Sequence, residues 1–133
     1  MNKVFTFLIV IILCAVFSLP SSAGLSLEKK QEIKALYSAN NLDEAYAQIT
    51  KIIEDERDFE LWYILANISQ DKGNNTNAVF FLQKSINLNP AFDKAHYNLG
   101  NIYLSEKRYN MAIKEYKETL KYKKEKRVKL KQI

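Results

Sequence analysis

The side chains that could do acid–base, nucleophilic or metal chemistry are few in this sequence. Its 133 residues include one histidine, His96, and one cysteine, Cys14. Five carboxylates gather between Glu54 and Glu60. A histidine can act as a general base, a cysteine as a nucleophile, and clustered carboxylates as calcium ligands. The surrounding sequence favours a structural role for each of them.

Cys14 lies inside an uncharged apolar run, and His96 replaces Trp62 in an internal repeat, at a position expected to be buried. The carboxylates lack the Asp and Gly spacing of an EF-hand loop. A glycine-rich phosphate loop and a serine elbow are absent from the sequence, and one histidine with one cysteine cannot form a zinc cluster. We therefore expect no active site, no cofactor and no metal.

Amide and tyrosine side chains recur at matching positions and could bind a peptide. A shift of 34 places Asn67 on Asn101 and Tyr63 on Tyr97. An asparagine amide offers both donors and an acceptor to a ligand's peptide group, and tyrosine adds rigid contact area with a polar tip. The alternative is that these are solvated polar positions. The candidate peptide-binding residues, which share one arc of the predicted helices, are Lys30, Lys34, Tyr63, Asn67, Gln70, Lys94, Tyr97, Asn98 and Asn101.

The elements that must position these side chains form an internal repeat. The same shift of 34 places Leu65 on Leu99 and Ala78 on Ala112, and a backward shift of 33 places Ala78 on Ala45. The apolar class is kept at almost every matched position, which is the signature of a repeat architecture. The chain divides into a signal segment (1–23), a degenerate first repeat (24–58), two regular repeats (59–92 and 93–126) and a basic tail (127–133).

Each repeat is predicted to be a pair of helices. In the second repeat Trp62, Leu65, Ala66 and Ser69 follow the i, i+3, i+4, i+7 spacing of one helical face. Turn residues around Gly73 follow, then a second apolar stripe. Nothing alternates with period two, so the sequence predicts an all-α chain.

The two regular repeats resemble the tetratricopeptide repeat family. One reads W-Y-x-L-A-N-I from Trp62, and the other reads H-Y-N-L-G-N-I-Y from His96. In the first repeat Lys29 and Glu32 stand where the family pattern has Trp and Leu. The resemblance implies an α-solenoid of about three helix-turn-helix repeats. It also implies that the polar arc lines a concave groove that binds extended peptides or partner helices.

The N-terminal segment is predicted to be an export signal. Lys3 precedes an uncharged stretch over residues 4–19, and small residues stand at Ser21 and Ala23. These sixteen residues span about 24 Å as a helix, less than the ~30 Å hydrocarbon core. We expect cleavage and export to the periplasm or the cell exterior; the alternative is an uncleaved membrane anchor.

Positive charge is concentrated at the C-terminus. Residues 24–118 contain 12 basic and 14 acidic residues, whereas residues 119–133 contain seven basic and one acidic. We expect the last helix to continue past Tyr122 and then to fray. The tail could contact anionic lipid headgroups or an acidic partner, but it lacks the interleaved aromatics of a nucleic-acid site.

These features predict an exported, non-enzymatic scaffold that binds a protein or peptide, with no nucleic-acid partner. The alternative is a cell-envelope assembly factor held at the membrane by residues 4–19 or by the basic tail.

Overall fold

Six α-helices follow one another in the computed structural model, which describes residues 25–52 and 54–132. They are α2 (Leu27–Ser38), α3 (Leu42–Thr50), α4 (Phe59–Asp71), α5 (Asn75–Leu88), α6 (Asp93–Ser105) and α7 (Tyr109–Lys131), and a short 3-10 helix η1 (Glu54–Glu56) precedes α4. The described ranges contain no β-strand. The prediction of an all-α repeat fold is confirmed.

The segment predicted to be a signal, residues 1–23 with Cys14, lies outside the described residues. Among the residues that are described, we find no helix with both the length and the apolar character needed to cross a membrane.

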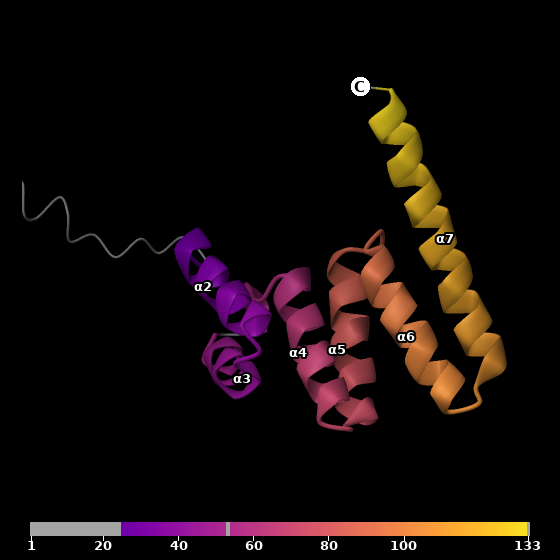
Figure 1. The fold of residues 1–133 in the computed structure, drawn as a ribbon. Coiled ribbons are helices and arrows are strands. Elements are labelled where there is room, and N and C mark those ends of the chain that lie inside the picture. The colour runs from indigo at the N-terminus through magenta and orange to yellow at the C-terminus, as the bar shows by residue number, and fades with distance from the viewer. Residues whose placement is uncertain (1–24, 53, 133) are drawn as a thin grey trace, which may run out of the picture.

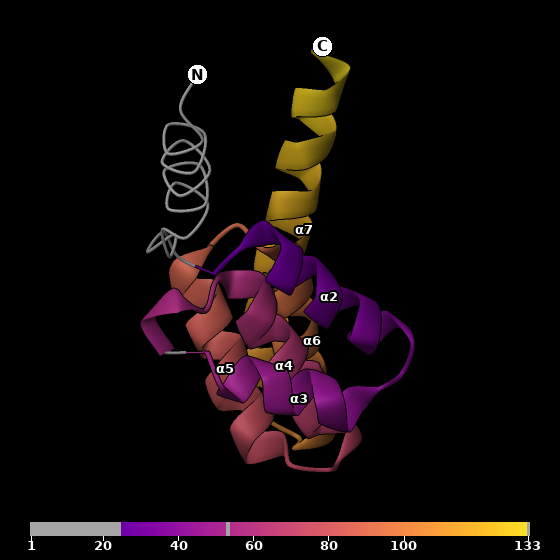
Figure 2. The ribbon, with the colours of Figure 1, turned by 90° about the vertical axis from the view of Figure 1, so that its left-hand side faces the viewer.

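The helices pair as three hairpins, α2 with α3, α4 with α5, and α6 with α7, arranged side by side in a row (Figure 1). Figure 2 looks along this row from the α2 end. All three hairpins turn in the same way, because Asn40, Gly73 and Lys107 each adopt a positive φ, of 62°, 74° and 58°. Such a residue just after a helix lets the following N–H groups bond back to the last turn. The first repeat, irregular by sequence, therefore has the same turn as the other two.

The hairpins share two apolar clusters. The first cluster consists of Ile33, Ala45, Ile49, Leu61, Trp62, Ile64, Leu65 and Ile68. The second consists of Ala66, Ala78, Leu82, Ala95, Leu99, Ile102, Tyr103 and Ala112. Helix α4 contributes to both clusters, so it joins the first hairpin to the last. The predicted stripe of Trp62, Leu65, Ala66 and Ser69 is buried, which confirms that interpretation.

A buried hydroxyl fixes the two helices of each regular hairpin to one another. Ser85 Oγ donates to the carbonyl of Phe59 at 2.7 Å. Thr119 Oγ1, at the equivalent position of the next repeat, approaches the carbonyl of Asp93 at 3.5 Å and donates to that of Glu115 at 3.0 Å. Ser85 and Thr119 are both buried. The 34-residue repeat therefore includes a buried polar contact as well as the apolar pattern.

The first repeat is one residue out of the register expected from sequence. The sequence analysis aligned the first repeat with the second by a shift of 33, which places Glu32 on Leu65. The observed helices α2 and α4 begin at Leu27 and Phe59, a shift of 32. As a result Ile33 is the fully buried residue of α2, and Glu32 is exposed. The expectation that Glu32 stands at the large apolar position of the pattern is wrong, because the register lies one residue further along.

Helix α7 runs through the predicted tail without the fraying expected after Tyr122. Lys126 forms an ion pair with Asp93 at the start of α6. The rings of Tyr122 and His96 lie 5.6 Å apart between centroids. These contacts hold α7 against α6. Helix α7 is longer than α5, its counterpart in the preceding hairpin, and its last turns extend past the other helices (Figure 1).

Gly100 of α6 lies against the ring of Tyr116 on α7. A Cβ added at this position would lie 2.7 Å from Cε1 of the Tyr116 ring. The same tyrosine donates its hydroxyl proton to Asn101 Oδ1 at 2.7 Å, which holds the ring in place. The group that approaches Gly100 is therefore the side chain of Tyr116.

Gly100→Ala is therefore expected to lower the free energy of unfolding by about 1–3 kcal/mol through overpacking. In a Tyr116→Ala background the same change should be neutral or stabilising, because alanine favours a helix over glycine by about 1 kcal/mol. Urea unfolding of the four proteins, followed by circular dichroism, measures this coupling. Equal losses in both backgrounds would show that the ring does not limit the position.

Candidate peptide-binding face

A chain of side-chain hydrogen bonds crosses from α2 through α4 to α6. Asn67 Nδ2 donates to the Tyr37 hydroxyl at 3.1 Å. Asn98 Nδ2 donates to Asn67 Oδ1 at 2.7 Å and to the Tyr63 hydroxyl at 3.2 Å. We call these four residues the polar ladder. All four hydrogen-bonding side chains are partly shielded from solvent, so the ladder fixes the side chains on the surface shared by the three helices.

A cleft of about 260 Å³ opens beside the ladder. It is lined by Lys34, Tyr37, Ser38, Glu60, Tyr63, Ile64, Phe92 and Lys94. The rings of Tyr63 and Phe92 meet edge to face, with centroids 5.0 Å apart. The cleft therefore combines an apolar side, two tyrosine hydroxyls and two ammonium groups.

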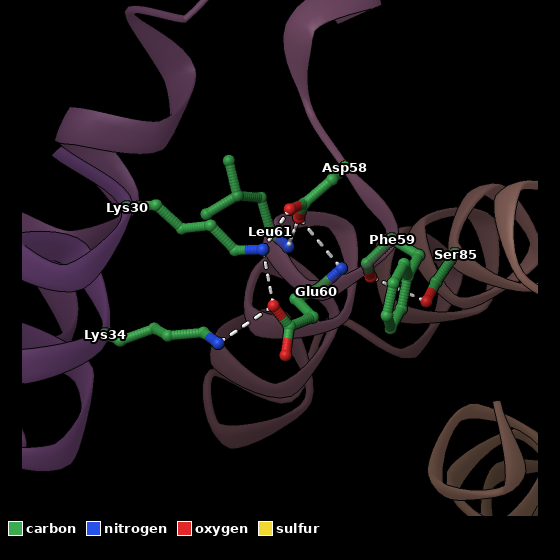
Figure 3. A network of polar contacts seen from close by, with 7 residues as sticks. All are labelled: Lys30, Lys34, Asp58, Phe59, Glu60, Leu61 and Ser85. Atoms are coloured by element: carbon green, nitrogen blue, oxygen red, sulfur yellow. Dashed lines mark hydrogen bonds and ion pairs between the residues drawn. The ribbon is translucent and has the colours of Figure 1, made fainter. Parts of the chain in front are cut away.

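The lysines of α2 are bound to the start of α4 (Figure 3). Lys30 pairs with Asp58 and with Glu60, the latter at 2.5 Å, and Lys34 Nζ lies 2.8 Å from Glu60 Oε2. Asp58 also caps α4, because its Oδ1 accepts from the backbone N–H groups of Glu60 and Leu61, each at 3.0 Å. An acceptor at this position satisfies N–H groups that have no partner within the helix.

These pairs shift the ionisation of their members. Hydrogen bonds from Lys30 and Lys34 lower the pKa of Glu60 below its ordinary value of 4.5. Burial opposes the charge of Lys30, but its hydrogen bonds to Asp58 and Glu60 outweigh burial and raise its pKa above 10.5. Both effects favour the charged forms, so the pairs persist at neutral pH.

The structure divides the nine candidate binding residues into groups. Lys30 and Lys34 meet at Glu60, while Tyr63, Asn67 and Asn98 belong to the polar ladder. The other four residues, Gln70, Lys94, Tyr97 and Asn101, belong to neither group.

Asn101, at the position equivalent to Asn67, accepts from Tyr116 instead of joining the ladder. Tyr97 is about half exposed and lies 6.1 Å from Tyr116 between ring centroids. Lys94 lines the cleft and forms no ion pair within residues 25–52 and 54–132. Gln70 is partly exposed in the last turn of α4.

Four residues of this region were missed by the sequence analysis: Tyr37, Glu60, Phe92 and Tyr116. Tyr37 could have been found from the helix caps. Ser26 Oγ accepts from the backbone of Lys29 and begins α2, just as Asp58 begins α4. Aligning these two caps gives the observed register and places Tyr37 in the last turn of α2.

His96 is held on both ring nitrogens. Its Nδ1 lies 2.7 Å from Glu115 Oε2 and its Nε2 lies 2.9 Å from the carbonyl oxygen of Pro90. The residue is 7% exposed. This confirms the interpretation of His96 as a packed residue, and it shows that the ring joins α7 to the start of α6.

Comparison with known proteins finds two family models, both described as tetratricopeptide repeat, which match residues 59–92 and 81–114. No curated protein matches the sequence.

Several solved structures share the fold. A structure titled "Crystal structure of MamA" has a TM-score of 0.63 and 20% identity, covering 71% of this chain and 56% of that one. "Crystal structure of MamA protein" has a TM-score of 0.63 and 27% identity, covering 68% and 50%. "MamA RS-1 ArsTM double mutant" has a TM-score of 0.65 and 14% identity, covering 74% and 56%. The chain thus spans about half the length of these structures.

Glu60→Gln is expected to lower the free energy of unfolding by about 1 kcal/mol at pH 7, because two lysines lose their shared carboxylate. Since the pKa of Glu60 is lower in the folded state, its stabilisation is present above pH 4.5 and is lost as the pH falls through the folded value. Urea unfolding at pH 7 and at pH 3 should show the two proteins converging at pH 3. Glu56→Gln, in the exposed η1, is the matched control and should change neither value. A difference that persists at pH 3 would contradict the assignment.

Proposed function

We propose that this chain, a member of the tetratricopeptide repeat family, is a non-catalytic scaffold that binds an extended peptide across α2, α4 and α6. We also propose that it is exported, on the basis of the predicted signal segment over residues 1–23. A protein-interaction scaffold is the general role of the family. The observation that carries the specific site is the polar ladder with its adjoining cleft. The ladder fixes side chains from all three helices before any ligand arrives, and such preorganisation favours binding.

The hydrogen-bonding groups left available by the ladder match those of a peptide backbone. The hydroxyls of Tyr37 and Tyr63 each accept from an asparagine, so each can still donate its own proton. Burial raises the pKa of Tyr37 above 10.0, which keeps that proton in place. Asn98 Oδ1 accepts no hydrogen bond from the described part of the chain. Peptide carbonyls can bind the tyrosines, and a peptide N–H can bind Asn98.

The charges beside the ladder favour an acidic peptide. Lys34 and Lys94 both line the cleft, while the one carboxylate there, Glu60, is already bound by Lys30 and Lys34. An acidic side chain of the ligand would meet the ammonium groups of Lys94 and of the partly exposed Lys34. The charge of Glu60 would repel the ligand little, because two lysines already neutralise it. We therefore infer a peptide with carboxylates near an apolar residue that packs on Phe92.

A catalytic role is not part of this proposal. His96, the side chain best suited to general acid–base chemistry, is 7% exposed and bound on both nitrogens, to Glu115 and to Pro90. A substrate would have to displace one of these partners to reach the ring.

Export is tested by the N-terminus of the protein in cells. A signal read by the peptidase should give a product that begins at Gly24, recovered outside the cytoplasm and identified by N-terminal sequencing or intact mass. Recovery of the uncut chain in the membrane fraction would favour the alternative, an assembly factor anchored by residues 4–19.

Peptide binding is tested by selecting displayed peptides against the full chain and measuring the affinity of the selected sequences by fluorescence anisotropy. We expect acidic sequences. Tyr37→Phe with Tyr63→Phe should weaken their binding about tenfold, because two hydrogen bonds to the peptide are lost.

Tyr109→Phe and Tyr122→Phe, made together, are the matched control, since both tyrosines lie on α7 and outside the cleft. Selected peptides that bind the ladder variant as tightly as the control would place the site elsewhere. Circular dichroism should be unchanged in all variants.

A further inference from the structure

A seam of side chains runs along α7 and is left uncovered by the described residues. Its first half is apolar, with Tyr109 57%, Ile113 51% and Leu120 67% exposed. Its second half is basic, with Lys124, Arg127 and Lys131 exposed. The steps between these residues are three, four or seven, so they share one face of the helix. We call these six residues the α7 seam.

Equivalent positions in the preceding hairpins are covered by a helix. Val79 and Ile86, the counterparts of Ile113 and Leu120 in the repeat, pack into the cluster that contains Ala95, Leu99 and Ile102 of α6. In the first hairpin Tyr46, the counterpart of Val79, packs into the cluster that contains Leu61, Leu65 and Ile68 of α4. By this equivalence, the apolar half of the α7 seam corresponds to a surface that packs against the following helix in the preceding hairpins.

The basic half of the seam specifies the charge of the occupant. Residues 117–131 contain eight basic and two acidic residues. All 15 acidic residues of the sequence lie within the described ranges, and none of them pairs with Lys124, Arg127 or Lys131. Charge complementarity therefore favours an occupant that carries acidic side chains beside these three cations.

A second copy of the chain does not supply a matching surface. Its own α7 is basic, so two seams would repel one another. The outward face of its α2 presents Glu28, Gln31 and Glu32, all exposed, with Leu27 as its one large exposed apolar side chain. A single leucine is not a stripe long enough to cover both Ile113 and Leu120. Neither surface fits both halves of the seam, which favours a helix of a different protein as the occupant.

We propose that the α7 seam binds an amphipathic helix of a partner protein, acidic in its first turns and apolar in the turns that follow. The direction comes from the repeat, because α6 follows α5 after a short turn and runs back along it (Figure 1). A helix bound in the same way has its N-terminus beside Lys124–Lys131 and its apolar stripe on Ile113 and Leu120. This site is separate from the polar ladder, so it stands or falls independently of peptide binding there.

The test uses the full chain and a labelled synthetic helix of about 20 residues, roughly 30 Å long. The peptide carries glutamates in its first two turns and leucines at i, i+4 and i+7 after them. A second peptide has the same composition in the opposite order. By fluorescence anisotropy the acidic-first peptide should bind at least about tenfold more tightly than the reversed one, and added salt should weaken its binding.

Matched variants separate the two halves of the seam. Ile113→Glu with Leu120→Glu should reduce the affinity at least about tenfold, whereas Leu130→Glu, exposed on another side of α7, should not. Lys124→Glu with Arg127→Glu should reduce the affinity and abolish its salt dependence, whereas Lys114→Glu with Lys129→Glu alters the net charge equally and should retain the salt dependence. All substitutions are at exposed positions, and circular dichroism checks the fold.

Three outcomes would overturn the proposal. The first is equal binding of the two peptides, or no binding of either. The second is self-association of the chain that Ile113→Glu with Leu120→Glu abolishes, which would assign the seam to a second copy. The third is binding of the chain to phosphatidylglycerol vesicles that this double variant leaves intact and that the acidic-first peptide does not inhibit, which would assign the basic half to a lipid surface.

Discussion

Each helical hairpin of this chain has two apolar sides, and only one of them can be covered within the hairpin. In α4, Ala66 packs in the cluster shared with α5 and α6, and Leu61, Leu65 and Ile68 pack in the cluster shared with α3. Burying the second side requires the preceding hairpin to lie in register, so the hairpins stack and stability depends on their interfaces. The buried hydroxyls of Ser85 and Thr119 and the close approach at Gly100 keep each regular hairpin in the geometry that this stacking needs.

The same stacking explains the polar ladder. When the apolar stripes of α2, α4 and α6 are in register, the polar positions beside them also align, which brings Tyr37, Asn67 and Asn98 within hydrogen-bond distance. Partly buried amides need partners, and here they find them in the neighbouring repeats. The ladder thus adds to the interface between hairpins and fixes the side chains of the candidate binding face.

Much of the fold could be predicted from sequence because its cause is periodic. The internal repeat, the stripe from Trp62 and the turn at Gly73 report packing that recurs along the chain, and each is found in the structure. The register of the first repeat could not be obtained in this way, since the apolar pattern of α2 is weak. Only its cap, Ser26, marks where the helix begins.

The candidate site was less predictable than the fold. The predicted helices place Asn67 and Asn98 on one arc. The hydrogen bond between them could not be predicted, because it depends on side-chain rotamers and on the spacing of two helices. Lys30 and Lys34 were grouped as binding residues without their pairing to Glu60, which lies on a different helix, α4. Long-range polar partners leave no periodic trace in a single sequence.

Methyl NOE spectroscopy on the full chain tests most directly whether the hairpins stack in register. Stacking in register predicts cross-peaks from the methyl groups of Val79 and Ile86 to those of Ala95, Leu99 and Ile102, which share one cluster. Helical α5 and α6 without any such cross-peaks would mean that the hairpins do not cover one another, and would contradict the stacked arrangement and the binding face that depends on it.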